Sequence, residues 1–315
     1  MTETLNSVKN QSYPDWECII VDDGSNDGSQ EIAKGFCEDT RFHFLERDSS
    51  KPKGANACRN IGAEKATGEA LLFLDGDDLL SEDCLKHRLE LMQNENLFVY
   101  NSGVFEAKIS NSVPFFPALN KGLNNEDYLG MFLEYITPWN IHSPIWKKAF
   151  FLELGGFDEE LQRFQDVDLH IRALSNNNLK IGFDRSDIIT SFYRKSEFHQ
   201  KMTLEKRRFL LDQGLIFADK ISTIAAKDSL KHLQGLLIYL HFRFEEVFAK
   251  DDSKRIERLV SKIKEDQHDF KISRELRYLQ YLFENLMIKA SKLRKALSYG
   301  AFRLYSKQKR EYYLA

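Results

Sequence analysis

The sequence has few of the features that mark secreted, membrane-spanning or nucleic-acid-binding proteins. Its 315 residues contain only four cysteines, none in C-x-x-C spacing, which favours reduced structural thiols over disulfides or a metal cluster. No apolar run approaches the ~20 residues needed to cross a membrane, and the N-terminus MTETLNSVKN lacks a charged-then-apolar signal layout. The formal net charge of -3 gives no basic excess to attract nucleic acid. These absences predict a cytoplasmic protein that binds no nucleic acid.

The most informative stretch that is present is LLFLDGDD, residues 71–78. A short apolar run that ends in acids predicts a buried strand that delivers carboxylates to the edge of an α/β sheet, where ligands bind. Carboxylates this close repel one another unless a cation lies among them, and a hard divalent ion that holds a phosphate fits. The residues leave an alternative open, an acidic loop in which Asp78 or Ser81 is a helix N-cap.

Strands and helices alternate through the first 80 residues, which predicts a parallel α/β sheet. The predicted strands cover residues 16–21, 42–45 and 70–74, and the predicted helices cover about 2–8, 30–36 and 55–66. The first strand ends in a glycine- and serine-rich loop, residues 22–29. Its backbone N–H groups and carboxylates suit the base and ribose of a nucleotide, although a plain turn and N-cap would look similar.

Two further side chains are candidates for chemistry. Arg59 lies on a helix that enters the same sheet edge, so we expect it to contact a phosphate or a structural carboxylate, unless it is a surface residue. Asp166 falls in the first turn of a predicted helix, where the helix dipole favours a carboxylate, and it can act as a general base if it faces a cleft. The alternatives for Asp166 are an N-cap or an ion pair with Arg163 or Arg172.

The pattern changes near residue 200, so we predict an α/β domain over residues 1–200 and a helical C-terminal extension over residues 201–315. Helices are expected near residues 204–223, 227–249, 251–267 and 270–299. The basic, aromatic stretch from Lys289 to Arg310 suits peripheral contact with an anionic membrane surface. Packing of a solvated helix on the α/β domain, or on a second subunit in a homo-oligomer, is the alternative.

Three separated segments together resemble the family 2 glycosyltransferases of the GT-A fold, over roughly residues 1–200. They are VDDGSNDGS, GANACRNIGAEKATGEALLFLDGDD and GGFDEELQRFQDVDLHIRAL. The resemblance implies a Rossmann-like, mostly parallel sheet with flanking helices. It also implies a nucleotide-sugar donor, usually a UDP-sugar, and a saccharide or lipid-linked acceptor.

The resemblance also implies roles for individual residues. Asp166 matches the general base, in a pair that reads Gln165-Asp166 where the family usually has two acids. The implied metal, Mn²⁺ or Mg²⁺, bridges the diphosphate of the donor, and its implied ligands are Asp75, Asp77, Asp78 and His199. The implied donor-binding residues are Asp22, Asp23, Ser25, Arg59, Asp75 and Gly76. The implied acceptor residues are Trp139, Asn140, His142 and Gln165, with core packing of Trp139 as the alternative.

The sequence departs from the family in two ways. The strand that usually precedes the helix at residues 2–8 is absent, which suggests a truncated chain with weakened donor binding. No Q-x-x-R-W segment is present, which favours a single-addition transferase over a processive synthase. We therefore expect a metal-dependent, inverting glycosyltransferase of bacterial surface polysaccharide synthesis, at the cytoplasmic face. A catalytically impaired nucleotide- or partner-binding homologue and a nucleotidyltransferase are the competing hypotheses.

Overall fold

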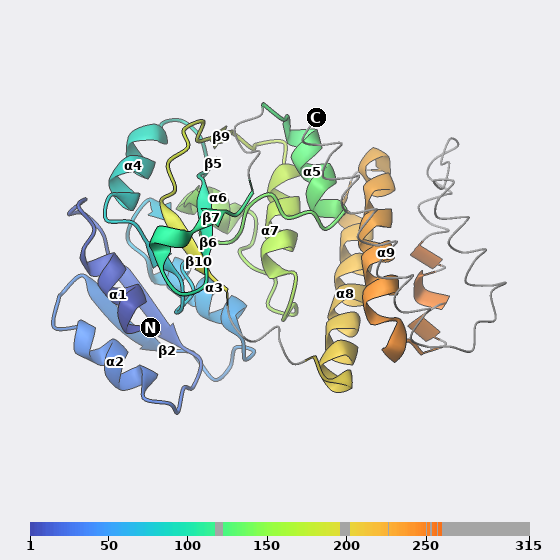
Figure 1. Cartoon of the computed structure of the whole chain (residues 1–315), viewed down its shortest axis with the longest axis horizontal. Helices are drawn as coiled ribbons and strands as arrows, with labels where there is room; N and C mark the ends of the chain where they lie inside the picture. Colours follow the sequence, from blue (N-terminus) through green and yellow to red (C-terminus); the bar gives the residue numbers. More distant parts are fainter. Residues whose placement is uncertain are drawn as a thin grey trace. The chain divides into compact units, whose positions relative to one another are not determined.

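The computed structural model describes residues 1–116, 122–195, 202–225 and 227–249, and most positions from 251 to 259. The chain forms two compact units. The first unit takes Met1–Tyr128 and Thr137–Lys201, and the second takes Leu129–Ile136 and the chain from Met202 onward. The first unit mixes strands and helices, whereas the elements that follow it are helical (Figure 1).

The strands of the first unit form three sheets. The first sheet pairs β1 (Cys18–Asp22) with β2 (Phe42–Glu46). The second has the order β4 (Leu79–Leu80), β10 (Ser191–Arg194), β6 (Ser102–Phe105) and β7 (Val113–Pro114). The third has the order β3 (Ala70–Leu71), β8 (Pro144–Lys147), β5 (Leu97–Val99) and β9 (Ile181–Phe183). The predicted α/β class is confirmed. The two four-stranded sheets are mixed and not mostly parallel as predicted, because each has one parallel pair, β6–β10 or β5–β9, and two antiparallel pairs, whereas β1–β2 is parallel.

Helices follow the strands as the alternation predicts. Those of the first unit are α1 (Thr2–Lys9), α2 (Ser29–Phe36), α3 (Ala55–Lys65), α4 (Cys84–Leu91), α6 (Lys148–Glu153) and α7 (Gln165–Leu174), with a 3-10 turn at Ile109–Asn111. The helix α5 (Asn125–Leu133) runs from the first unit into the second.

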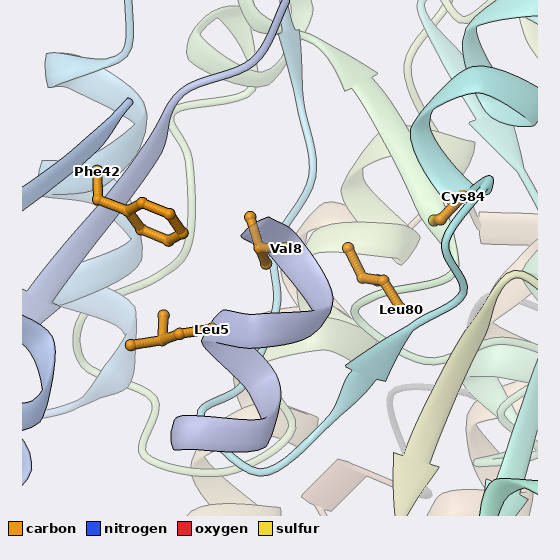
Figure 2. Close-up of a cluster of buried hydrophobic side chains, with 5 residues drawn as sticks. All are labelled: Leu5, Val8, Phe42, Leu80 and Cys84. Atoms are coloured by element: carbon orange, nitrogen blue, oxygen red, sulfur yellow. The ribbon is translucent and has the colours of Figure 1, made fainter. Parts of the chain in front are cut away.

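The helix α1 packs through its apolar face into a small hydrophobic cluster. Figure 2 shows Leu5 and Val8 of α1 between Phe42 of β2 and Leu80 of β4, with Cys84 of α4 beyond them. All five side chains are buried, and burial of a leucine or valine stabilises a fold by about 1.5–3 kcal/mol. Because β4 directly follows residues 75–78, this cluster fixes the downstream end of that acidic segment.

The predicted strand at residues 70–74 is only partly realised. Residues 70 and 71 pair with β8, whereas residues 72–74 join no ladder within the described part of the chain. In the same described part, β1 pairs with β2 alone. An extended segment is assigned as a strand only where a neighbour takes its backbone hydrogen bonds. The predicted strand is therefore confirmed at residues 70 and 71 and wrong at residues 72–74.

The second unit is built on two helices. They are α8 (Leu204–Ile224) and α9 (Leu233–Phe244), joined by a 3-10 segment (Lys227–His232) and followed by another (Glu245–Val247). The hydroxyl of Thr203 accepts the backbone N–H of Lys206 at 3.2 Å and caps α8. A Cβ at Gly214 would lie 2.3 Å from a methyl carbon of Leu240, so this glycine sets how closely α8 and α9 pack.

The predicted helix at residues 204–223 is confirmed, and the one at 227–249 is α-helical over Leu233–Phe244, with 3-10 segments on both sides. The predicted helix at 251–267 is described only at some positions up to 259. The predicted helix at 270–299 and the basic stretch from Lys289 to Arg310 lie outside the described residues. Within the described residues, every helix is too short or too polar to cross a membrane.

Candidate active site

The acidic loop, residues 75–78, joins the extended residues 72–74 to β4. The side chain of Asp75 is 39% exposed and Asp77 is exposed, whereas Asp78 is buried. The backbone N–H of Asp78 donates to the carbonyl of Asp75 at 3.1 Å, which closes a tight turn. Two carboxylates of this turn therefore face outward, and the third faces the interior.

The acidic loop is braced by two elements that are distant in sequence. The hydroxyl of Thr4 in α1 donates to the carbonyl of Gly76 at 2.9 Å. Arg194 of β10 donates its backbone N–H to Asp78 Oδ1 at 2.8 Å and its Nε to the carbonyl of Asp77 at 2.9 Å. Sequence reasoning missed Thr4 and Arg194, because neither lies in a motif and only the tertiary packing brings them to this loop.

Asp78 faces a buried histidine. Its Oδ2 lies 3.4 Å from Nε2 of His142, and both side chains are at most 1% exposed. Burial, with the nearby charges of Asp75 and Asp77, raises the pKa of Asp78 to about 8. Burial, with the charge of Arg88, lowers the pKa of His142 to about 3. A metal ligand must be ionised and accessible, so the arrangement favours Asp75 and Asp77 as ligands, and Asp78 as a third ligand stays a prediction.

The β1 loop, residues 22–25, is organised by Asp22. Its Oδ2 accepts the backbone N–H groups of Gly24 at 2.8 Å and Ser25 at 3.0 Å, and Nε2 of Gln30 at 2.9 Å. Burial acts to raise the pKa of Asp22, but the hydrogen bonds from Ser25, Gly24 and Gln30 outweigh it and lower the pKa. Gly24 has φ +86°, which a residue with a side chain rarely adopts. Asp22 therefore shapes the loop from within.

Asp23, the next residue, points the other way and forms an ion pair with Nε of Arg47. The Arg47 side chain is 15% exposed and that of Asp23 31%. Nη1 of Arg47 also donates to the carbonyls of Asp48 at 3.0 Å and Lys51 at 2.5 Å. Asp23 is accessible, as the base-binding prediction requires, and Arg47 is a cation at this position that the motif analysis missed.

Arg59 connects α3 to the acidic loop. Its Nη2 donates to Asp75 Oδ1 at 2.5 Å, and its Nη1 donates to Asn56 Oδ1 at 3.3 Å. The guanidinium carbon lies 5.4 Å from the centroid of the Phe157 ring. The predicted contact of Arg59 with a carboxylate is present, and the alternative of a surface position is wrong, because the side chain is only 12% exposed.

Asp166 lies half-buried in the first turn of α7. Burial raises its pKa, the charge of Asp75 acts in the same direction, and the backbone of Val167 and the charge of Arg59 act against it. Asp166 is thus within electrostatic reach of both Asp75 and Arg59. A raised pKa suits a carboxylate that accepts a proton near neutral pH.

Two of the three structural alternatives for Asp166 can be compared with the structure, whereas an ion pair with Arg163 stays a prediction. The N-cap of α7 is Phe164, with φ 64°. Arg172 bonds instead to Asp168, through Nη2 at 2.7 Å and Nε at 2.9 Å. An N-cap role for Asp166 and its pairing with Arg172 are therefore both wrong. The neighbouring Gln165 is also half-buried.

The predicted aromatic surface for an acceptor sugar is wrong for Trp139. This side chain is fully buried, with ring centroids of Tyr128 at 5.1 Å and His170 at 5.5 Å. Asn140 is also buried, and its Oδ1 accepts the hydroxyl of Ser143 at 2.7 Å. A sugar ring stacks only on an accessible face, so the alternative of core packing describes Trp139. His142, fully buried against Asp78, is likewise no acceptor contact.

Tyr193 of β10 is a further neighbour that the sequence did not reveal. Burial raises its pKa, and the charges of Asp78, Asp77 and Asp75 add to that effect. Its half-buried hydroxyphenyl group therefore lies beside the acidic loop. The antiparallel pairing of β10 with β4, which directly follows that loop, brings it there.

The outward carboxylates fit a divalent cation. Asp75 and Asp77 supply hard oxygen ligands, and Mg²⁺ or Mn²⁺ typically takes one or two carboxylates together with phosphate oxygens of the substrate. Among the described residues, no group of three His, Cys, Asp or Glu side chains could hold a metal alone. His199 lies outside the described residues.

Comparison with known proteins identifies the class of domain. Residues 1–142 match the model of Glycosyl transferase family 2, the family that the three motifs resemble. TuaG of Bacillus subtilis, named as a teichuronic acid biosynthesis glycosyltransferase, is 41% identical over 97 residues, which cover 30% of this chain and 37% of TuaG. A glycosyltransferase of Methanocaldococcus jannaschii is 28% identical over 200 residues, which cover 62% of this chain and 64% of that protein. The chain thus spans little more than a third of TuaG.

Solved structures show the same fold. Residues 1–349 of S. aureus TarS superpose with a TM-score of 0.63 at 17% identity, over 98% of this chain and 87% of that chain. The mannosyltransferase PcManGT from Pyrobaculum calidifontis, in complex with GDP-Man and Mn²⁺, gives 0.52 at 14% identity, over 97% and 81%. These likenesses confirm the predicted GT-A fold.

Proposed function

We propose that the chain transfers a sugar from a nucleotide-sugar donor to a saccharide or lipid-linked acceptor, with inversion at the anomeric carbon. The observation that carries this proposal is the convergence of Asp75, Arg59 and Asp166 from three elements. Asp75 pairs with Arg59 at 2.5 Å, and both lie within electrostatic reach of Asp166. To these three residues we assign the roles of metal-binding carboxylate, phosphate-binding cation and base.

The proposed reaction assigns each group a role. The acceptor hydroxyl attacks the anomeric carbon while the bond from that carbon to the phosphate oxygen breaks and the nucleoside diphosphate leaves. Asp166 accepts the hydroxyl proton, for which its burial-raised pKa is suited. Asp75 and Asp77 would hold the cation, which when bound stabilises the negative charge of the leaving diphosphate. Asp23 and Ser25 would contact the nucleotide, with Asp22 and Gly76 supporting their loops.

Related proteins support the donor and metal classes. TarS has been solved with UDP-GlcNAc, at a TM-score of 0.54 and 18% identity over 84% of this chain. PcManGT has been solved with GDP-Man and Mn²⁺. We propose Mn²⁺ or Mg²⁺ as the ion and UDP as the nucleotide. A role in surface polysaccharide synthesis rests on the likeness to TuaG. We further propose that residues 1–200 are the catalytic domain and residues 201–315 a helical extension.

A donor-hydrolysis and transfer screen tests this function. UDP-, GDP- and dTDP-sugars are incubated with the full chain in Mn²⁺ or in EDTA, and the release of nucleoside diphosphate is measured. We expect release from one donor class in Mn²⁺ only.

Asp166→Asn should reduce turnover by about a hundred- to ten-thousandfold while UDP binding stays unchanged. Glu153→Gln, at an exposed position of α6, is the control. Full turnover in Asp166→Asn would remove the base role, and release of pyrophosphate from a nucleoside triphosphate would indicate a nucleotidyltransferase.

A catalytically impaired, nucleotide-binding homologue is the second candidate. The observation in its favour is that residues 72–74 and the second edge of β1 have no strand partner in the described part of the chain. Unpaired backbone next to the acidic loop leaves that loop less firmly held on one side. If this candidate is right, calorimetry finds Mn²⁺-dependent binding of UDP, but no donor in the screen is turned over.

A further inference from the structure

Arg59 contacts one of the two carboxylates that we propose as metal ligands. It contacts Asp75 at 2.5 Å, and that is the carboxylate with the role of ligand. The guanidinium is also held by two groups outside the acidic loop, Asn56 at 3.3 Å and the ring of Phe157 at 5.4 Å. Its side chain is 12% exposed and that of Asp75 39%, so the carboxylate is open to solvent beside a largely buried cation.

The ion pair has an electrostatic reason. Asp75, Asp77 and Asp78 share one turn, and Asp75 also raises the pKa of Asp166 through its charge. Like charges this close destabilise one another unless a cation is present. In the protein without ligands, Arg59 supplies that positive charge to Asp75.

A metal ion bound to Asp75 would compete with Arg59 for the negative charge of this carboxylate. A divalent cation on the carboxylate would face the guanidinium of Arg59 across the same group, and two cations repel strongly at that separation. The repulsion is relieved if the guanidinium leaves Asp75 for an anion. The diphosphate of a nucleotide is such an anion, and arginine binds phosphate oxygens through paired N–H groups.

We propose that Arg59 is a placeholder cation: it neutralises Asp75 before ligands bind and exchanges to the donor diphosphate when a metal ion takes its place on Asp75. This inference rests on the proposed function and goes beyond it. It makes metal and nucleotide binding mutually dependent, because each ligand removes the obstacle to the other. Coupling of this kind typically amounts to about a five- to 150-fold change in affinity.

The competing explanation is that Arg59 only braces the acidic loop. Both explanations predict that Arg59→Gln weakens binding of UDP, so that result does not separate them. They differ in the effect on the metal alone. If Arg59 only braces the acidic loop, Arg59→Gln should bind Mn²⁺ more weakly than the wild type, because the loop loosens. If Arg59 is a placeholder cation, Arg59→Gln should bind Mn²⁺ more tightly, because a competing cation has been removed.

The test measures Mn²⁺ binding to the full chain by electron paramagnetic resonance, with and without UDP. In the wild type, UDP should tighten Mn²⁺ binding about ten- to a hundredfold. In Arg59→Gln, Mn²⁺ alone should bind about tenfold more tightly than to the wild type. UDP should then tighten Mn²⁺ binding less than in the wild type, because only the direct contact of the metal with the diphosphate remains. Arg59→Lys, which keeps the charge, should retain part of the coupling.

Two controls separate the possible causes of a change. Arg41→Gln removes the same charge at a surface ion pair with Asp39 and should leave Mn²⁺ binding unchanged. Asp77→Asn should weaken Mn²⁺ binding both with and without UDP. Thermal melting of each variant establishes that it is folded.

The outcomes distinguish this inference from the proposed function. If the wild type shows UDP-dependent Mn²⁺ binding but folded Arg59→Gln binds Mn²⁺ alone no more tightly than the wild type, the exchange is overturned and the proposed function stands. If the wild type binds no UDP in Mn²⁺, the proposed function fails, and the exchange fails with it.

Discussion

The β1 loop and the acidic loop use adjacent aspartates in the same way but fix them by different means. In each loop one acid is buried, Asp22 or Asp78, and a neighbour faces outward onto an arginine, Asp23 onto Arg47 and Asp75 onto Arg59. Asp22 takes its hydrogen bonds from within eight residues of itself. Asp78 takes its hydrogen bond from the backbone of Arg194, a strand far along the chain.

Because of this difference, the pKa values of the two buried acids shift in opposite directions. Hydrogen bonds outweigh burial at Asp22 and lower its pKa, so the carboxylate is ionised and organises its loop. Burial dominates at Asp78 and raises its pKa to about 8. Asp22 and Asp78 therefore prefer opposite charge states. In both loops the buried aspartate shapes the loop, and the outward aspartate is available to a ligand.

The largest expected difference is between variants of Asp77, which faces outward in the acidic loop, and Asp78, which faces inward. Asp77→Asn should lower sugar transfer by about a hundredfold or more, because a ligand of the charge-stabilising cation is lost. Asp78→Asn should change Mn²⁺-dependent UDP binding by at most about threefold, since an amide resembles the protonated acid and its oxygen still accepts the N–H of Arg194. Turnover and calorimetric titration of both variants check this. An equal loss in Asp78→Asn would make Asp78 a direct ligand.

The next effect is on stability at the β1 loop. Asp22→Ala should lower the free energy of unfolding by about 1–3 kcal/mol, because two backbone N–H groups and Gln30 lose their acceptor. Urea denaturation at pH 7 measures the change, with Asp27→Ala, an exposed acid a few residues on, as control. A loss no larger than that of the control would show that the loop does not need Asp22.

The pH dependence of stability should have opposite signs at the two buried acids. The folded pKa of Asp78 is raised from 3.8 to about 8, so the folded protein holds a proton that the unfolded chain lacks, and stability falls as pH rises through that window. Asp78→Asn should remove this fall, which is at most about 1.4 kcal/mol per pH unit. The folded pKa of Asp22 is lowered, so its contribution is present above the ordinary value of 3.8 and is lost as pH falls below it.

Urea denaturation in EDTA between pH 3 and 9 measures both slopes. Asp22→Asn should flatten the acid side of the stability profile, and Asp78→Asn the neutral side. If both variants flatten the same side of the stability profile, the two buried acids do not differ in charge state.

The smallest effect concerns the outward acid of the β1 loop. The pair of Asp23 and Arg47 is partly exposed, so Asp23→Ala should change the free energy of unfolding by less than about 1 kcal/mol. The same variant should weaken UDP binding about tenfold, the size of one hydrogen bond to a charged group. A large loss of stability with unchanged UDP affinity would reverse the roles that we assign to Asp22 and Asp23.

Local patterns predicted much of the fold and the outward carboxylates of the candidate site. Alternating apolar runs and helix signals located β1, β2, α2 and α3, and the motif containing residues 75–78 located the outward carboxylates. The failures lie where a side chain depends on distant neighbours. Trp139 was expected at an acceptor surface and is packed into the core, because aromatic residues serve both purposes and burial decides between them.

The sequence by itself determined the α/β class, the match of residues 1–142 to Glycosyl transferase family 2, and the position of Asp22 in a loop whose hydrogen bonds all come from within eight residues. Only the tertiary structure decided that Asp166 lies within electrostatic reach of Asp75 and Arg59. It also decided that Asp78 turns inward to His142. The physical reason is the range of the interactions: hydrogen bonds within a turn follow from neighbouring residues, whereas burial and charge proximity depend on which strands pair.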